Sequence, residues 1–253
     1  MIKTENLCKK YGNFTALKNL NLNVHPGEIY GFLGPNGAGK TTTIRILIGL
    51  LKPSSGRVYI CGYDLSKNPI SAKSLVGFIP DRPYLYEKLT AREFMHFIAG
   101  VYGMSEKDVE EKANALLEFF DLKGWADELI ESFSHGMKQR LVFASAFLHE
   151  PRVIIVDEPM VGMDPKGARL LKDAFRKLAH KEGKTIFMST HTLEIAEEVC
   201  DRIGIINQGE LIAEGTMNEL RELSRTKEAH LEEIFLKLTA GEDVQELLKS
   251  LHG

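Results

Sequence analysis

The feature that most constrains this chain is a glycine-rich segment, Gly34-Pro35-Asn36-Gly37-Ala38-Gly39-Lys40-Thr41, which fits the pattern G-x-x-x-x-G-K-[ST]. An apolar run at 29–33 precedes it, as expected for a strand buried on both faces, and residues 41–51 have a helical pattern. In such a unit, backbone amides turn around phosphate oxygens and the helix N-terminus adds positive potential. Lys40 supplies a point charge, and the Thr41 hydroxyl is a ligand for Mg²⁺. We predict a phosphate-binding loop; the alternative is a glycine-rich turn without a ligand.

Two carboxylates end a second apolar run, Val153-Ile154-Ile155-Val156-Asp157-Glu158. A carboxylate at the end of a buried strand is costly unless a cation or hydrogen bonds satisfy it. Beside a phosphate-binding loop, Asp157 is placed for Mg²⁺. Glu158, one residue later, is placed to orient or deprotonate a water that attacks the terminal phosphate. The alternative is that Asp157 caps a neighbouring element and Glu158 is solvated.

A third segment, Ser134-His135-Gly136-Met137, begins an apolar-periodic helix about twenty residues before Asp157. A serine and a glycine at a helix start form a potential anion site, because the first amides of the helix have no partner within it. Taken alone, a segment of this kind is more often a simple N-cap. Its placement between the two phosphate motifs is what makes it a candidate.

The order of expected elements predicts one α/β core interrupted by helices. Residues 20–24 alternate between apolar and polar, which favours an antiparallel strand near the start. From about residue 84 to 150 the pattern is helical; it opens with a capping box at Thr90 and Glu93, and a second helix follows Ser105. Strand-like runs alternate with helices again after Pro151, which indicates a parallel sheet. Residues 231–238 have amphipathic helical spacing.

Composition excludes several other classes of protein. The 253 residues are 43% hydrophobic and 26% charged, the profile of a folded protein rather than a disordered one. The net charge is −3, from 32 basic and 35 acidic residues, so no polyanion such as nucleic acid is an obvious partner. No window approaches 18 consecutive apolar residues, and we expect no membrane-spanning segment in the sequence.

Several motifs in one order give the chain a resemblance to the nucleotide-binding subunits of ABC transporters, from about residue 2 to 238. The segment Phe133-Ser134-His135-Gly136-Met137 stands where the family has its Leu-Ser-Gly-Gly-Gln signature. It keeps the second and fourth members of that pattern. His135 and Met137 depart from it and resemble a variant found among exporters, so the resemblance carries phosphate contact only to Ser134 and Gly136.

The resemblance implies a fold and a division of the chain. The expected fold is a P-loop NTPase α/β core with a mainly parallel sheet, an N-terminal antiparallel β subdomain and an inserted α-helical subdomain. Within a single ATPase domain spanning 1–253, residues 1–83 and 151–222 would form the core, 84–150 the helical signature subdomain and 223–253 a C-terminal helical tail.

The resemblance also assigns roles by position. Tyr11 would stack on adenine, His191 would sense the terminal phosphate, and Gly162-Met163-Asp164 would cross to a partner subunit. The expected catalytic residues are Glu158, His191 and Lys40, and the expected metal ligands are Thr41, Asp157 and Asp81. The residues expected to bind ATP are Tyr11, Gly34, Pro35, Asn36, Gly37, Ala38, Gly39, Lys40, Thr41, Thr42, Ser134 and Gly136.

The clearest departure from the family is Asp81, in Gly77-Phe78-Ile79-Pro80-Asp81, where the family generally has a glutamine. That glutamine touches Mg²⁺ and the attacking water and relays the nucleotide state to the membrane subunit. An aspartate is shorter and anionic. It could bind Mg²⁺ directly or through water, but it also adds negative charge beside the triphosphate, so its role stays open here.

By the same resemblance, the cofactors are ATP and Mg²⁺, and the function is ATP hydrolysis that powers transport, with export favoured. Two copies, or this chain and a paralogous ATPase subunit, would pair head to tail around ATP. Separate transmembrane permease subunits would hold them at the cytoplasmic face of the membrane. The competing interpretations are a P-loop phosphotransferase acting on a small metabolite and a DNA- or ribosome-associated ATPase of the same superfamily.

Overall fold

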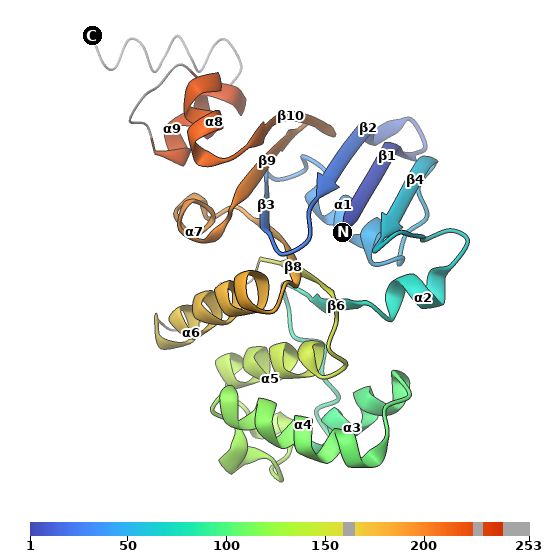
Figure 1. Cartoon of the computed structure of the whole chain (residues 1–253), viewed down its shortest axis with the longest axis vertical. Coiled ribbons are helices and arrows are strands. Elements are labelled where there is room, and N and C mark those ends of the chain that lie inside the picture. The colour runs from blue at the N-terminus through green and yellow to red at the C-terminus, as the bar shows by residue number, and fades with distance from the viewer. Residues whose placement is uncertain (159–164, 225–229, 240–253) are drawn as a thin grey trace.

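The protein is described by a computed structural model, which covers residues 1–158, 165–224 and 230–239. Two β-sheets and a group of helices form three stacked parts (Figure 1). The strands are β1 (Ile2–Tyr11), β2 (Phe14–Val24), β3 (Ile29–Leu33), β4 (Ser55–Ile60), β5 (Tyr63–Asp64), β6 (Val76–Ile79), β7 (Val153–Asp157), β8 (Thr185–Thr190), β9 (Arg202–Asn207) and β10 (Glu210–Gly215).

The helices lie between and around the sheets. The α-helices are α1 (Lys40–Leu47), α2 (Pro69–Lys73), α3 (Ala91–Val101), α4 (Glu106–Phe119), α5 (His135–Phe147), α6 (Pro165–Arg176), α7 (Leu193–Val199), α8 (Met217–Leu223) and α9 (Leu231–Thr239). Short 3₁₀ turns occupy Lys123–Trp125 and Ile130–Ser132, and a π-helical turn at Lys177–Lys181 extends α6.

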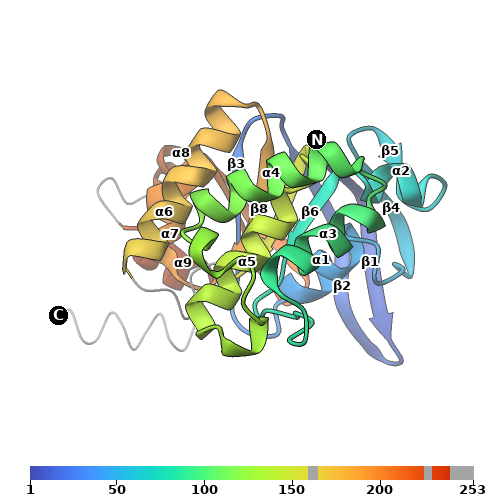
Figure 2. The same cartoon turned by 90° about the horizontal axis from the view of Figure 1, so that it is seen from below.

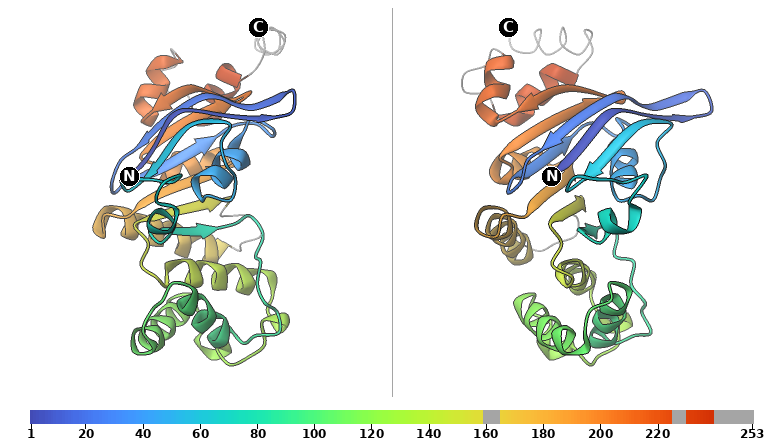
Figure 3. Two further views of the ribbon diagram at one scale, coloured as in Figure 1. Left: turned by 90° about the vertical axis from the view of Figure 1, so that its right-hand side faces the viewer. Right: turned by 45° about the vertical axis from the view of Figure 1, so that its right-hand side comes forward.

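The larger sheet has the order β10-β9-β3-β8-β7-β6, and all its neighbours are parallel except the edge pair β10 and β9. The smaller sheet, β2-β1-β4-β5, is antiparallel. Figure 3 shows it, in blue and cyan, on the opposite side of the larger sheet from helices α3, α4 and α5. The predicted fold class, a mainly parallel core with an N-terminal antiparallel part and inserted helices, is confirmed.

The central strands are buried on both faces, as their continuous apolar runs predict. In β7, Val153 and Ile155 belong to the core between the two sheets, which also holds α1. Ile154 and Val156 belong to the core that joins the sheet to α3, α4, α5 and α6. Alternate side chains of β7 therefore pack against the layers on the two faces of the sheet.

Helices α3, α4 and α5 form a group below the parallel sheet, and they lie in front of it in the view from below (Figure 2). The capping box predicted for α3 is present: the Glu93 amide donates to Thr90 Oγ1 at 3.1 Å, and the Thr90 amide donates to Glu93 Oε2 at 2.8 Å. Ser105 caps α4, whose residues Val109, Ala113 and Leu117 are buried on one face. The first helix of this group begins at Ala91, directly after the predicted cap Thr90.

Helix α1 is shorter than the sequence pattern indicated, ending at Leu47 rather than Leu51. Gly49 has φ +69°, in the left-handed region. Helices often end at a residue in this conformation, which glycine adopts readily. The amides of Leu50 and Leu51 both donate to the Arg45 carbonyl at 2.9 Å, which satisfies a carbonyl in the last turn. The apolar residues beyond Leu47 therefore continue the hydrophobic pattern without continuing the helix.

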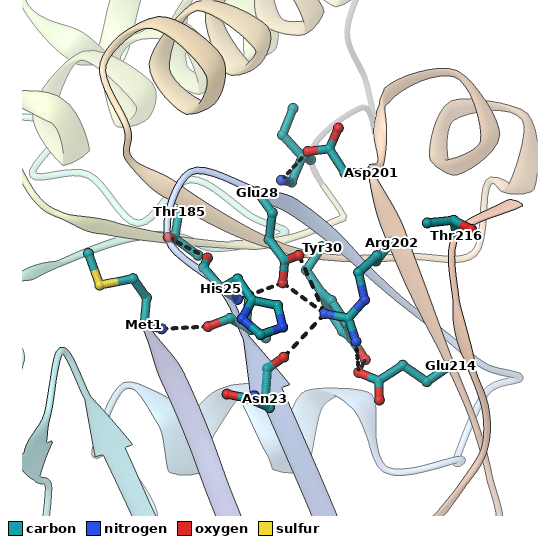
Figure 4. Close-up of polar contacts among 12 residues, drawn as sticks. Met1, Asn23, His25, Glu28, Tyr30, Thr185, Asp201, Arg202, Glu214 and Thr216 are labelled. Carbon is teal, nitrogen blue, oxygen red and sulfur yellow. Dashed lines mark hydrogen bonds and ion pairs between the residues drawn. The ribbon is translucent and has the colours of Figure 1, made fainter. Parts of the chain in front are cut away.

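A polar network fastens the larger sheet at the start of β3 (Figure 4). Arg202 donates to Glu28 Oε1 at 3.2 Å and pairs with Glu214 Oε1 at 3.0 Å, and the Tyr30 hydroxyl donates to Glu214 at 2.8 Å. Burial is the main reason why the pKa of Tyr30 is raised. The network ties β3 to β9 and β10 at the end of the strand opposite the glycine-rich loop, which leaves the other end of the sheet for the site.

Candidate functional site

The candidate site lies where β3, β7 and β8 end. Parallel strands bring their carboxyl ends to one edge, which is where α/β sheets bind ligands. A cavity of about 820 Å³ opens there, lined by residues from the phosphate loop, from the ends of β7 and β8, and from the hairpin of β1 and β2. Its size is that of a small-molecule site.

Close packing makes the loop between β3 and α1 depend on glycine. A Cβ atom at Gly34 would lie 2.3 Å from the Ile206 carbonyl oxygen. Gly39 has φ +115°, and a Cβ there would lie 2.9 Å from the Ala16 carbonyl oxygen. The Gly209 amide donates to the Ala38 carbonyl at 2.9 Å and holds the loop against the turn after β9. The loop is thus held by contacts with residues distant in sequence.

Lys40 begins α1 and is 8% exposed. Its ammonium donates to the Gly34 carbonyl at 2.6 Å and to the Pro35 carbonyl at 3.2 Å, so the side chain arches across the loop. Burial lowers the pKa of Lys40, and the nearby carboxylates of Glu158 and Asp157 oppose that shift. A cation in this position can bind an anion that lies over the loop.

Asp157 ends β7 directly beside Ser189 of β8, its partner in the strand register. The Ser189 hydroxyl donates to Asp157 Oδ1. Burial raises the pKa of Asp157, and the negative charges of Asp81 and Glu158 add to that rise. An oxygen ligand crowded by other carboxylates is stabilised in its charged form when a cation binds beside it.

Glu158 and His191 are in direct contact. His191 Nδ1 lies 2.8 Å from Glu158 Oε2, and the His191 backbone amide donates to the same oxygen at 3.3 Å. Glu158 has φ +52°, an uncommon conformation for a residue other than glycine. Its own amide donates to the Ser189 carbonyl at 3.0 Å, which helps to hold it there. Backbone strain of this kind is concentrated at functional sites.

The hairpin of β1 and β2 contributes two aromatic side chains to the cavity. Tyr11 and Phe14 are 46% and 63% exposed and face each other in the register of the hairpin. Lys9 Nζ lies 5.1 Å from the centre of the Tyr11 ring. A planar base would find a stacking surface here.

The start of α5 contributes to the cavity in an unexpected way. Ser134 caps the helix, and its hydroxyl accepts from the Met137 amide at 3.3 Å. Neither Ser134 nor Gly136 lines the cavity, whereas His135 between them does. A Cβ atom at Gly136 would meet no atom within 4 Å in the described part of the chain, so this helix start is open.

The cavity brings together most of the residues that the sequence singled out. Those that line it are Tyr11, Asn36, Gly37, Gly39, Lys40, Thr41, Thr42, Asp81, Asp157, Glu158 and His191. Gly34 and Pro35 line a smaller neighbouring cavity instead, and Ala38 is buried beneath the loop. The segment Gly162-Met163-Asp164 lies outside the described residues.

Sequence reasoning missed five residues that line the cavity: Phe14, Ala16, Arg82, Pro83 and His135. Phe14 could have been predicted, because it follows Tyr11 across a tight turn that contains Gly12. Arg82 and Pro83 follow Asp81 directly, and His135 lies between two residues already singled out. Ala16 had no such signal, since only the fold places β2 beside the phosphate loop.

The family model described as ABC transporter matches residues 17–161. The linearmycin resistance ATP-binding protein LnrL of Bacillus subtilis (strain 168) is 40% identical over 220 residues, which cover 87% of this chain and 70% of that protein. The bacitracin transport ATP-binding protein BcrA of Bacillus licheniformis is 42% identical over 225 residues, or 89% of this chain and 72% of BcrA.

Two solved structures extend the comparison to the fold. One is described as the ATP-binding subunit of an ABC transporter; it is 35% identical, has a TM-score of 0.89, and the match covers 94% of this chain and 99% of that one. The other is the dimeric ATP-binding cassette MJ0796 in a post-hydrolysis state with ADP and Pi, at 30% identity and a TM-score of 0.78, covering 86% and 99%. This chain therefore belongs to the ABC transporter family, as an ATP-binding and ATP-hydrolysing subunit.

Proposed function

We propose that two nucleotide sites form between two copies of this chain and drive export through separate membrane-spanning subunits. The observation that carries the proposal is the arrangement around Lys40, Asp157, Glu158 and His191, beside a cavity that Ser134 and Gly136 of the same copy do not line. A second copy would supply that open helix start to the terminal phosphate.

Within one copy, each residue has a distinct task. Lys40 and the loop amides hold the phosphates, and Tyr11 stacks on the base. Glu158 orients the attacking water and accepts its proton, while His191, bound to Glu158 Oε2, keeps that carboxylate in place. Cleavage of the bond to the terminal phosphate removes the group that joins the two copies, and they separate.

Mg²⁺ fits the residues present. The available ligands are the Thr41 hydroxyl and the Asp157 and Asp81 carboxylates, all hard oxygen donors that line the cavity. Among the described residues, no group of three or more His, Cys, Asp or Glu side chains could hold a metal ion. Mg²⁺ is usually bound by one or two carboxylates together with substrate phosphates, so this incomplete set is suitable. When bound, the ion would neutralise charge that develops on the phosphate oxygens.

The direction of transport is inferred from the relatives, and the membrane partners from the helices of this chain. LnrL is named for linearmycin resistance and BcrA for bacitracin transport. Transport that confers resistance removes a compound from the cell, so these names favour outward transport for this chain. In the described residues no helix has the length and apolarity to cross a bilayer, so we assign the membrane-spanning part of the transporter to other subunits, with this chain at the cytoplasmic face. Of the two partners that the sequence leaves open, a second copy or a paralogous ATPase subunit, we propose the second copy.

The paired site is tested with Ser134→Arg in a Glu158→Gln background, where ATP would not be turned over. We expect ATP and Mg²⁺ to convert Glu158→Gln from monomer to dimer in light scattering, and the double variant to stay monomeric while binding ATP normally. Ser105→Arg is the matched control, because Ser105 caps α4 in the same way through the Asp108 amide at 3.3 Å. Normal pairing of the Ser134→Arg variant would exclude the proposed site.

A further inference from the structure

Helix α9 packs against two elements of the nucleotide site. Its residues Leu231 and Ile234 are fully buried in a small core with Ala196 of α7 and Leu33, the last residue of β3. Leu33 directly precedes the phosphate loop, and α7 begins two residues after His191. One apolar cluster therefore joins α9 to the strand before the loop and to the helix after the histidine.

A second cavity, of about 280 Å³, lies between α9 and the nucleotide site. Phe235 of α9 lines it together with Gly34, Pro35, Asn36, Thr190, His191 and Leu193. Asn36 and His191 also line the larger nucleotide cavity. These two residues thus stand between the two spaces, with Phe235 on the side away from the nucleotide.

Glu197 of α7 ties the helices together. Its Oε1 accepts from Arg221 of α8 at 3.2 Å, and its Oε2 accepts from the Leu231 amide, the first residue of α9, at 3.1 Å. His230 Nδ1 lies 3.5 Å from the same Oε2. The side chain of Glu197 is only 23% exposed, so these contacts are partly shielded from water. A charged acceptor at the first amide of a helix is a favourable arrangement.

We propose that α9 is a positioning element for hydrolysis, acting through Phe235 and Glu197 on the segment that carries His191. The inference rests on the role proposed above for His191. The side chain of His191 is 62% exposed, so its contact with Glu158 depends on the placement of its backbone between β8 and α7. The packing of α9 against α7 holds one end of that segment. Phe235 lines the same cavity as His191, so truncating Phe235 would enlarge the space into which the segment can move.

The test compares Phe235→Ala with Leu236→Ala in the full chain. Leu236 is the next residue of α9 and is 40% exposed, so it reports general effects of truncating this helix. We expect Phe235→Ala to lower kcat about tenfold or more, since small misplacements of a catalytic group are costly, with KM and the Kd for ATP unchanged. Leu236→Ala should leave kcat unchanged, and Phe235→Tyr should restore most of the lost rate.

A second pair of variants tests the same proposal without truncating an apolar side chain. Glu197→Gln should lower kcat, whereas Glu198→Gln should not, because Glu198 pairs with Lys172 and Arg176 of α6 rather than with α9. This pair keeps the proposal testable if Phe235→Ala fails to fold. Unchanged kcat in Glu197→Gln and in a folded Phe235 variant would overturn it.

A double-mutant comparison separates positioning from general stability. If α9 acts through His191, Phe235→Ala should cause little further loss of kcat in a His191→Ala background. An equal loss in both backgrounds would show that α9 does not act through His191. Wild-type hydrolysis by His191→Ala alone would instead remove the proposed role of His191, so the two failures are distinguishable.

Discussion

Two groups of His191 contact Oε2 of Glu158: the imidazole Nδ1 lies 2.8 Å from it, and the backbone amide donates a hydrogen bond to it at 3.3 Å. One carboxylate oxygen is thereby fixed by two groups of a single neighbour. The side chain of Glu158 is 17% exposed, so little water competes for these contacts. The arrangement orients the carboxylate toward the cavity that the phosphate loop borders.

The first prediction concerns Glu158→Gln. The amide keeps the size of the carboxylate and loses its ability to accept a proton, so kcat should fall by at least about 10² while ATP binding is retained. The measurement is phosphate release together with nucleotide titration of the purified variant. Glu150→Gln is a matched control, because Glu150 has a similar positive φ, +53°, outside the cavity. Wild-type turnover by Glu158→Gln would exclude the proposed role.

The second prediction concerns Lys40→Ala. Its ammonium is the charged donor that spans the loop, and a hydrogen bond to a charged group contributes about 1.5–3 kcal/mol. The Kd for ATP should therefore rise about ten- to a hundredfold, measured by calorimetric titration. Lys18→Ala is the control, since Lys18 forms an ion pair with Glu210 on the surface. Equal ATP affinity in both variants would contradict the role given to Lys40.

The fold was predictable where local chemistry decides it. Three such features depend on residues a few positions apart: the apolar run that forms β3, the glycines after it, and the capping box of α3. The end of α1 was missed because the apolar pattern continues beyond Leu47, while the glycine that stops the helix, Gly49, had no stronger signal than other glycines. Hydrophobic periodicity locates a buried face better than it locates a helix end.

The site was predictable in its motifs but not in its contacts. The contact between Glu158 and His191 joins residues 33 positions apart, and Phe14 reaches the cavity only because β2 turns back beside β1. The contacts of Glu197 with α8 and α9 likewise span 24 and 34 positions. Such pairs are fixed by the packing of strands and helices, which no local pattern in one sequence reports.

The third prediction concerns Asp81→Asn. If Asp81 is a ligand of Mg²⁺ as proposed, the loss of its charge should raise the Mg²⁺ concentration needed for half-maximal hydrolysis by about fivefold, or about 1 kcal/mol. The measurement is a Mg²⁺ titration of the ATPase rate at fixed ATP. Asp64→Asn serves as control, because Asp64 binds Ser66 outside the cavity. A lower Mg²⁺ requirement in Asp81→Asn would show that Asp81 only adds repulsion beside Asp157.

The fourth prediction concerns His149, which stacks on Tyr102 with ring centres 3.6 Å apart and planes within 10°. Its Nε2 lies 3.1 Å from the Val76 carbonyl oxygen, and no described residue hydrogen-bonds its buried Nδ1. Burial lowers the pKa of His149 from 6.5 to about 4. The folded protein therefore keeps this ring neutral at pH values where the unfolded chain protonates it.

The sign of the pH dependence follows from that difference. Between about pH 6.5 and about 4 the unfolded state binds the extra proton, so the free energy of unfolding should fall as the pH is lowered through this range. After allowance for partial exposure to solvent, we expect a loss of about 1–2 kcal/mol from this residue. His149→Gln retains a donor for Val76 and does not titrate, so chemical denaturation should show a smaller loss for it than for the wild type. His25→Gln is the matched control, at an exposed histidine directly after β2. Equal slopes in all three proteins would show that His149 is not the group responsible.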